Sequence, residues 1–260
     1  MPGFLIDLDG TMYKGTEPIP SAAAFINILE QKQLPYYYLT NNSSRTPEQV
    51  CVHMRQVGIE AEPEQVITTS QAAAEYVMKH GKGKRVYCIG GTGLQQALLE
   101  AGLELTEDEA DYVVQGVDRT FDYEKLTKAV RFILDGALFV STNQDRLLPA
   151  ENGFLPGSGS ICAAIETATQ TKPVVIGKPS PILMDYALRK IGLPKEDVWM
   201  IGDNIDTDIA GGKAVQCRTA LVLTGVATKD NVDAWQAKAG VKADVTADDL
   251  EQLAHVLGLI

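Results

Sequence analysis

Short apolar runs alternate with amphipathic helical segments along most of this 260-residue chain. The run FLI (4–6) shows no polar alternation, which is typical of a strand buried on both faces of a parallel sheet. LPYYYLT (34–40) reads as the next strand, and between them Ser21 caps a helix with an apolar face formed by Ala22, Phe25, Ile26 and Leu29. Such alternation predicts an α/β fold with a doubly wound parallel sheet.

The same alternation continues further along the chain. Thr46 and Gln49 form the pattern of a capping box with Pro47 at the first helical position, and Gly58 is placed to end that helix. Further strands are expected in VITTS (66–70), PVVIGKPS (173–180), VWMIGDN (198–204) and TALVLTG (219–225). Further helices are expected up to about residue 80, from Pro181 to Ile191 with Gly192 as its end, and through Ile209 and Ala214.

A segment between GKGK (81–84) and TKPVV (171–175) has its own complete set of elements. Its strand candidates are VYCIG (86–90), DYVVQGV (111–117) and ALFVST (137–142), and its helix candidates lie near residues 93–101, 122–135 and 158–169. We therefore expect residues 81–175 to form a small α/β domain inserted into a core domain of residues 1–80 and 176–260.

Composition excludes several classes of protein. The formal net charge of −11 opposes binding to nucleic acid and to anionic membranes. No apolar stretch approaches the length of a membrane span and no signal-type N-terminus is present, so we expect a cytoplasmic protein. The four cysteines and three histidines are scattered, without the spacing of a disulfide framework or a zinc site.

Four polar clusters follow predicted core strands: DLDGT (7–11), LTNNSS (39–44), GKPS (177–180) and GDNIDTD (202–208). Each alone has a plainer interpretation, as a strand-to-turn junction, a polar loop or a solvated lysine. The carboxyl ends of parallel strands form the ligand-binding edge of an open sheet, so we expect the clusters to converge. The carboxylates brought together there, without histidine or thiol, favour Mg²⁺ over zinc, and they are Asp7, Asp9, Asp203 and Asp208.

Magnesium beside a lysine and several hydroxyl and amide donors is suited to stabilising a transferring phosphoryl group. Of Asp7 and Asp9, one aspartate would attack phosphorus and form an aspartyl-phosphate. The other would give a proton to the leaving alcohol and take one from water.

In this order, and across the whole chain, the four clusters resemble the signature motifs of the haloacid dehalogenase superfamily. The inserted segment carries GVDRTFDYEKL (116–126), STNQD (141–145) and PGSGS (156–160). These stretches resemble the type IIA capped phosphatases, a NagD-like group that includes para-nitrophenyl phosphatases and bacterial acid sugar phosphatases. The resemblance implies a Rossmann-like core, an inserted α/β cap of type C2, and Mg²⁺-dependent hydrolysis of small phosphorylated substrates.

Position by position, the resemblance implies that Asp7 is the nucleophile and Asp9 the acid and base. It implies that Mg²⁺ is bound by the side chains of Asp7 and Asp203 and by the backbone carbonyl of Asp9, with Asp208 supporting them. The residues implied to bind the phosphoryl group are Thr40, Asn41, Asn42 and Lys178. Dehalogenases and phosphonatases of the superfamily lack an aspartate at the position of Asp9. The resemblance therefore implies a phosphatase or a phosphomutase.

Arg146 lies in a predicted loop of the inserted segment, where it could pair with a substrate carboxylate while Asn143 and Asp145 bind sugar hydroxyls. A solvated surface arginine is the alternative. Two other functions stay open, a phosphomutase and a non-catalytic protein that binds phosphorylated metabolites. The resemblance is also compatible with a homodimer formed through the cap.

Overall fold

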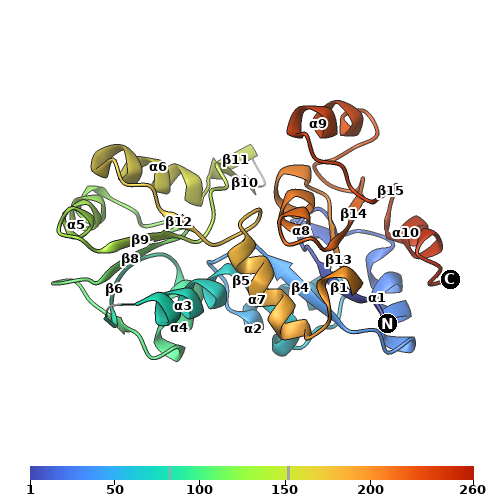
Figure 1. Cartoon of the computed structure of the whole chain (residues 1–260), viewed down its shortest axis with the longest axis horizontal. Coiled ribbons are helices and arrows are strands. Elements are labelled where there is room, and N and C mark those ends of the chain that lie inside the picture. The colour runs from blue at the N-terminus through green and yellow to red at the C-terminus, as the bar shows by residue number, and fades with distance from the viewer. Residues whose placement is uncertain (82, 151–152) are drawn as a thin grey trace. The chain divides into compact units, whose positions relative to one another are not determined.

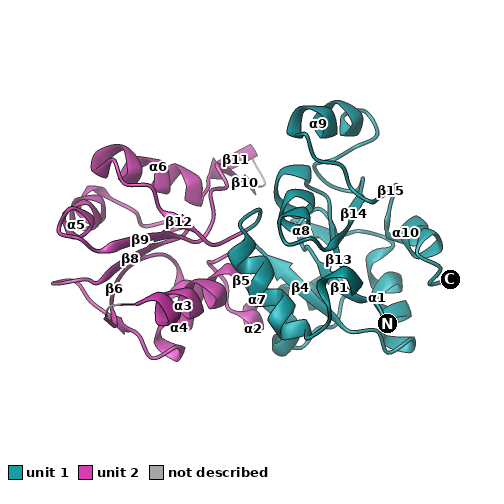
Figure 2. Ribbon diagram, in the orientation of Figure 1, with its two compact units in different colours: residues 1–40, 50–67, 178–260 teal, residues 41–49, 68–177 magenta. Residues whose placement is uncertain are grey.

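Figure 1 shows the computed structural model of the chain, which describes residues 1–81, 83–150 and 153–260. The chain divides into two compact units, coloured separately in Figure 2. Unit 1 comprises residues 1–40, 50–67 and 178–260, and unit 2 comprises residues 41–49 and 68–177. Each unit contains a parallel sheet with flanking helices, which confirms the predicted α/β fold class. The domain boundaries drawn from the sequence stay a prediction.

Unit 1 is built on a six-stranded sheet with the order β15-β14-β13-β1-β4-β5. The strands are β1 (Gly3–Ile6), β4 (Tyr36–Thr40), β5 (Val66–Thr68), β13 (Val198–Gly202), β14 (Arg218–Val222) and β15 (Val245–Ala247). Strand β1 pairs in parallel with β4 on one side and with β13 on the other. The strand order therefore reverses between β1 and β13, and such a reversal favours a ligand site at the carboxyl ends of these strands.

Helices contribute to both faces of this sheet. They are α1 (Ala22–Gln31), α2 (Pro47–Gln56), α7 (Pro181–Ile191), α8 (Ala210–Ala214), α9 (Val232–Ala239) and α10 (Leu250–Val256). Helix α1 contacts α10, whereas α7 contacts α8 and β4. Phe4 and Ile6 of β1 join the core that includes side chains of α1 and α10, while Leu5 between them does not, as expected for alternating strand residues. A small hairpin of β2 (Tyr13–Lys14) and β3 (Glu17–Pro18) follows β1.

The predicted helix ends largely agree with the structure. The Thr46 N–H donates to Oε1 of Gln49 at 3.0 Å, and the Gln49 N–H donates to Oγ1 of Thr46 at 3.3 Å, which is the predicted capping box. Gly192 ends α7 in the left-handed region, with a φ of +68°. Ser21 stands at the N-cap of α1 as predicted, but its hydroxyl makes no capping hydrogen bond.

Unit 2 contains a five-stranded sheet with the order β12-β9-β8-β6-β7. The strands are β6 (Arg85–Ile89), β7 (Glu104–Leu105), β8 (Tyr112–Gln115), β9 (Leu138–Ser141) and β12 (Val174–Val175), with a hairpin of β10 (Leu147–Ala150) and β11 (Gly153–Pro156). Helices α5 (Tyr123–Leu134) and α6 (Ser158–Thr169) pack together, as do α3 (Thr69–His80) and α4 (Thr92–Glu100) (Figure 1). The three strands and three helices predicted inside the insertion are all present. Within the described ranges, no helix has both the length and the apolar character needed to cross a membrane.

Strand β12 corrects one prediction. The sequence places the strand before GKPS in the core sheet, but Val174 and Val175 pair with Val140 and Ser141 of β9 in the sheet of unit 2. An apolar run of this length carries no signal for which of two parallel sheets it joins. Lys178 therefore follows a strand of unit 2 and begins the last segment of unit 1.

Candidate active site

Two aspartates follow the neighbouring strands at which the strand order reverses. Asp7 comes directly after β1 and Asp203 directly after β13. The register pairs Ile6 with Ile201, and the Asp7 N–H donates to the Ile201 carbonyl at 2.9 Å. Both aspartates are buried. The parallel register of β1 and β13 therefore places the two carboxyl groups at the same edge of the sheet.

Asp208 completes a group of three carboxylates. It lies in a π-helical turn, Ile205–Ile209, that leads into α8, and its Oδ2 accepts a hydrogen bond from the Asn204 N–H at 3.1 Å. One carboxylate oxygen from each of Asp7, Asp203 and Asp208 lies within 4.8 Å of the others. We call these three residues the acid cluster. Irregular helical turns of this kind are frequent at functional sites.

Lys178 supplies the cation beside the acid cluster. Its Nζ lies 2.5 Å from Oδ1 of Asp7 and 2.7 Å from Oδ1 of Asp208, and it donates to the Leu39 carbonyl at 3.2 Å. Burial lowers the pKa of the Lys178 ammonium, but the carboxylates of Asp208 and Asp7 outweigh this effect and raise the pKa above its ordinary value. The ammonium therefore stays charged beside its two carboxylate partners, Asp7 and Asp208.

The electrostatics of the acid cluster favour a further cation. Burial raises the pKa of the Asp7 carboxyl well above its ordinary value; Lys178 opposes this, and the charges of Asp208 and Asp203 add to it. Burial, followed by the charge of Asp208, raises the pKa of Asp203 to about 7. A divalent cation bound here would allow all three carboxylates to ionise together.

Asp9 occupies a different environment from Asp7. Its side chain is exposed, and its backbone bridges to Tyr13 in the turn that follows β1. Gly10 comes next, with a φ of +91°, and a Cβ at this position would lie 2.3 Å from Oδ2 of Asp203. Only glycine fits both the backbone conformation and the space. The DLDGT motif thus combines a buried carboxylate, an exposed one and a glycine-dependent turn.

The segment after β4 carries the predicted phosphate-binding amides. Thr40, the last residue of β4, is buried, and the chain enters unit 2 at Asn41. The Asn41 carbonyl accepts hydrogen bonds from Oγ1 of Thr69 at 2.9 Å and from Nδ2 of Asn143 at 2.8 Å. Oδ1 of Asn42 accepts from the N–H and the hydroxyl of Ser44, both at 2.8 Å. The start of α3 and the segment after β9 therefore fix the backbone here.

The three candidate specificity residues of the insertion differ in their surroundings. Asn143 is buried, and besides its bond to Asn41 its Oδ1 accepts from the Asp145 N–H at 3.1 Å. Asp145 is half-buried and the Arg146 side chain is exposed. The sequence did not reveal that the Asn143 amide donates its hydrogen bond to Asn41, which also belongs to unit 2.

The structure thus brings four predicted site residues into direct proximity, namely Asp7, Lys178, Asp203 and Asp208. Thr40 and Asp9 belong to the same unit, at the carboxyl ends of β4 and β1. The remaining predicted residues belong to unit 2, and they are Asn41, Asn42, Asn143, Asp145 and Arg146.

Two residues near the acid cluster were missed by the sequence analysis. Thr224 donates its hydroxyl to the Gly10 carbonyl at 2.7 Å, and the Val226 N–H donates to Oδ2 of Asp203 at 2.5 Å. Both lie in the loop after β14, the strand next to β13. The available signal was their place at the carboxyl end of a core strand, the edge at which the other clusters were expected.

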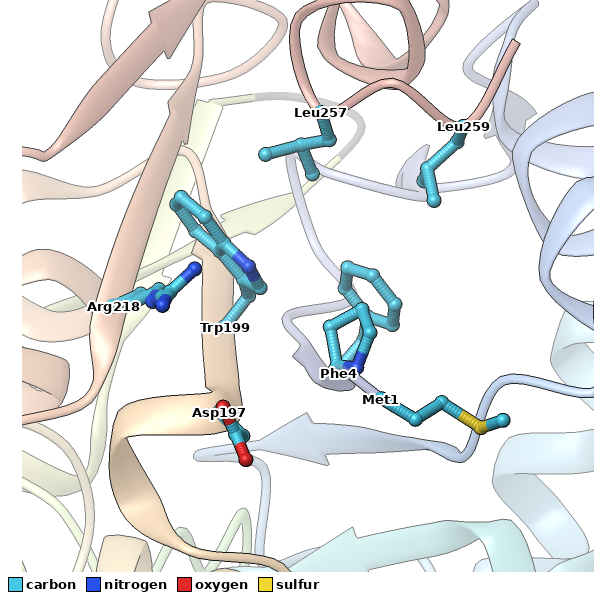
Figure 3. Close-up of a pocket in the computed structure, with 8 residues that line it drawn as sticks. Met1, Phe4, Asp197, Trp199, Arg218, Leu257 and Leu259 are labelled. Atoms are coloured by element: carbon cyan, nitrogen blue, oxygen red, sulfur yellow. The ribbon is translucent and has the colours of Figure 1, made fainter.

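A pocket of about 200 Å³ lies at the other edge of the unit 1 sheet (Figure 3). Phe4, Trp199 and Arg218 line it near the amino ends of β1, β13 and β14, and the Arg218 guanidinium lies 5.6 Å from the Trp199 ring centre. Because Asp7 and Asp203 follow the carboxyl ends of the same strands, this pocket is separate from the acid cluster.

Comparison with known proteins agrees with the fold and gives the family of the chain. Residues 4–104 match the haloacid dehalogenase-like hydrolase family, and residues 175–253 match a family described as HAD-hydrolase-like. An acid sugar phosphatase of Staphylococcus saprophyticus is 45% identical over 98% of this chain and 97% of its own, and one of Staphylococcus aureus is 48% identical over 88% of this chain and 89% of its own. The solved structure of a p-nitrophenyl phosphatase from Archaeoglobus fulgidus has a TM-score of 0.93 at 36% identity, covering 98% of both chains.

The chain therefore belongs to the haloacid dehalogenase-like hydrolase family. Within that family it falls in the NagD-like group, and the enzyme class predicted from the sequence, a phosphatase, is confirmed by these relatives.

Proposed function

We propose that this chain is a Mg²⁺-dependent phosphatase that hydrolyses small phosphorylated metabolites, such as sugar or acid-sugar phosphates, through an aspartyl-phosphate on Asp7. The observation that carries the proposal is the buried contact of Asp7 with Lys178 inside the acid cluster, at the point where the strand order reverses. The names of the relatives support the substrate class, since they are acid sugar phosphatases and p-nitrophenyl phosphatases.

The acid cluster fits Mg²⁺ by its donor chemistry. Its three carboxylates offer oxygen ligands within 4.8 Å of one another, and hard oxygen ligands suit this ion. Asp7, Asp203 and the backbone carbonyl of Asp9 would hold the ion, with Asp208 behind them. When bound, Mg²⁺ neutralises the carboxylates and withdraws charge from the phosphoryl oxygens.

In the first step a carboxylate oxygen of Asp7 attacks phosphorus, and the bond between phosphorus and the ester oxygen breaks. The leaving alcohol takes a proton from Asp9. In the second step water gives a proton to Asp9 and attacks phosphorus, so that the acyl-phosphate P–O bond breaks and Asp7 is restored. The buried Lys178 ammonium orients Asp7 and stabilises negative charge on the phosphoryl oxygens.

Thr40, Asn41 and Asn42 would bind the phosphoryl group through hydroxyl, amide and backbone donors. The backbone of that segment is already fixed by hydrogen bonds from Thr69 and Asn143, so little ordering is needed when the substrate binds. Exposed Arg146 selects substrates that carry a carboxylate in addition to the phosphate.

The test is phosphate release from a panel of sugar phosphates, phosphorylated sugar acids and para-nitrophenyl phosphate, with and without Mg²⁺. We expect turnover that requires Mg²⁺, is lost on chelation and is absent in Asp7→Asn. Isomerisation of a sugar phosphate that requires a bisphosphate activator and releases no free phosphate would indicate a phosphomutase. Saturable binding in Mg²⁺ without turnover would indicate a binding protein. Full activity after exhaustive chelation would contradict the metal assignment.

A further inference from the structure

The loop after β14 packs directly against the acid cluster and its neighbouring turn. A Cβ at Gly225 would lie 1.9 Å from Oδ2 of Asp203 and 2.7 Å from the Gly10 Cα. These distances are far below ordinary contact, so Asp203 and Gly10 already occupy the space that a side chain at position 225 would take. The loop, residues 223–227, therefore forms part of the surroundings of the metal-binding carboxylates proposed above.

Backbone donors of this loop fix the Asp203 residue. The Val226 N–H donates to Oδ2 of Asp203 at 2.5 Å, and the Ala227 N–H donates to the Asp203 carbonyl at 3.0 Å. One carboxylate oxygen is thereby held by the protein, which restricts rotation of the carboxyl group. Such outer hydrogen bonds orient metal ligands in many proteins.

The same loop holds the turn that contains Asp9. The Thr224 hydroxyl donates to the Gly10 carbonyl at 2.7 Å, and the Gly10 N–H donates to the Tyr13 carbonyl at 2.7 Å. Gly10 is thus held through both of its backbone polar groups, and its N–H belongs to the peptide unit that carries the Asp9 carbonyl. The orientation of that carbonyl, a proposed Mg²⁺ ligand, depends on this turn.

We propose that Thr224 is a positioning residue that keeps the Asp9 turn and the Asp203 carboxylate in one fixed arrangement. The inference rests on the proposed function, because the Mg²⁺ ligands that Thr224 would position are ligands that this function requires. Thr224 acts through Gly10, while the adjacent Gly225 and Val226 act on Asp203. Removal of the Thr224 hydroxyl should loosen the ligand set without removing any ligand.

The experiment compares Thr224→Val, which keeps the shape and removes the hydroxyl, with Thr224→Ser, which keeps the hydroxyl. The readout is Mg²⁺ binding to the substrate-free protein by isothermal titration calorimetry, with kcat and KM for para-nitrophenyl phosphate measured beside it. We expect Thr224→Val to weaken Mg²⁺ binding about 10-fold and to lower kcat more than it changes KM, and Thr224→Ser to stay near wild type. Thr228→Val, at an exposed threonine four residues on, is the matched control and should bind Mg²⁺ as wild type does.

A second variant keeps the test decisive if Thr224→Val folds poorly. Gly225→Ala, at a position outside the left-handed backbone region, should also weaken Mg²⁺ binding, because the added Cβ must displace the Asp203 carboxylate. Gly211→Ala is its control, since a Cβ there meets no atom closer than 3.5 Å. Thermal denaturation without Mg²⁺ reports folding of each variant.

The two possible failures are distinguishable. Wild-type Mg²⁺ affinity in folded Thr224→Val, or equal losses in Thr224→Val and Thr224→Ser, would overturn the positioning role while the proposed function stands. A wild-type protein that binds no Mg²⁺ would overturn the proposed function, and this inference with it.

Discussion

The Lys178 ammonium donates a 2.5 Å hydrogen bond to Oδ1 of Asp7, and both residues are buried. This contact joins residues 171 positions apart in the sequence. The ammonium is a positive charge that offsets the carboxylates of the acid cluster, and it lies directly on the proposed nucleophile.

Replacement of Lys178 by methionine should destabilise the metal-free protein, because it leaves the carboxylates of Asp7 and Asp208 buried without their partner. We expect a loss of about 3 to 5 kcal/mol in the free energy of unfolding by urea at pH 7. The matched control is Lys229→Met, which removes the exposed ion pair with Asp248 and should cost less than about 1 kcal/mol. Equal losses of unfolding free energy in the two variants would show that the buried contact stabilises the fold no more than the exposed ion pair does.

Asn143→Ala should impair all substrates alike. Its amide donates to the Asn41 carbonyl, so its loss loosens the proposed phosphate-binding segment instead of removing a contact to one sugar. We expect kcat/KM to fall by about 3- to 10-fold, corresponding to about 0.5 to 1.5 kcal/mol, for para-nitrophenyl phosphate and for a sugar phosphate. An effect confined to the sugar phosphate would restore the direct role predicted from the sequence.

Arg146→Ala should impair only substrates that carry a carboxylate. The Arg146 side chain is exposed, whereas its carbonyl accepts hydrogen bonds from the Gly157 N–H and the Ser160 hydroxyl, so truncation should leave the backbone in place. Loss of a charge-assisted hydrogen bond should cost about 1.5 to 3 kcal/mol in kcat/KM for a phosphorylated sugar acid. A neutral sugar phosphate of similar size is the comparison substrate. Equal effects on both, or none, would remove Arg146 from the site.

Asp118→Asn should lower stability at neutral pH but not in acid. Asp118 is partly desolvated, which raises its pKa, but hydrogen bonds from Lys125 and Thr120 outweigh this and hold the pKa below the ordinary carboxyl value of 3.8. A depressed folded-state pKa stabilises the fold above the unfolded value, and this contribution is lost as pH falls through the folded value. Urea denaturation should show a wild-type advantage at pH 7 that shrinks below about pH 4. A difference that does not change with pH would contradict this.

The sequence predicts which site residues lie at the carboxyl ends of β1 and β13, because the signals there are local. Asp7 and Asp203 each follow an apolar run that reads as a buried strand, and parallel pairing places such ends together. The destination of β12 was predicted wrongly, because Val174 and Val175 read alike in either sheet. The contact of Asn143 with Asn41 could not be foreseen either, since it joins residues 102 positions apart with no pattern between them.

Chemical trapping can show whether Asp7 carries the phosphoryl group during turnover. The protein is mixed with para-nitrophenyl phosphate and Mg²⁺, quenched in acid within the first turnover, reduced with borohydride and analysed by peptide mass spectrometry. Because borohydride converts an acyl-phosphate to an alcohol, we expect homoserine at position 7 in the wild type and no such product in Asp7→Asn. Reduction at any other aspartate, or steady phosphate release from a protein that never shows modification at position 7, would contradict it.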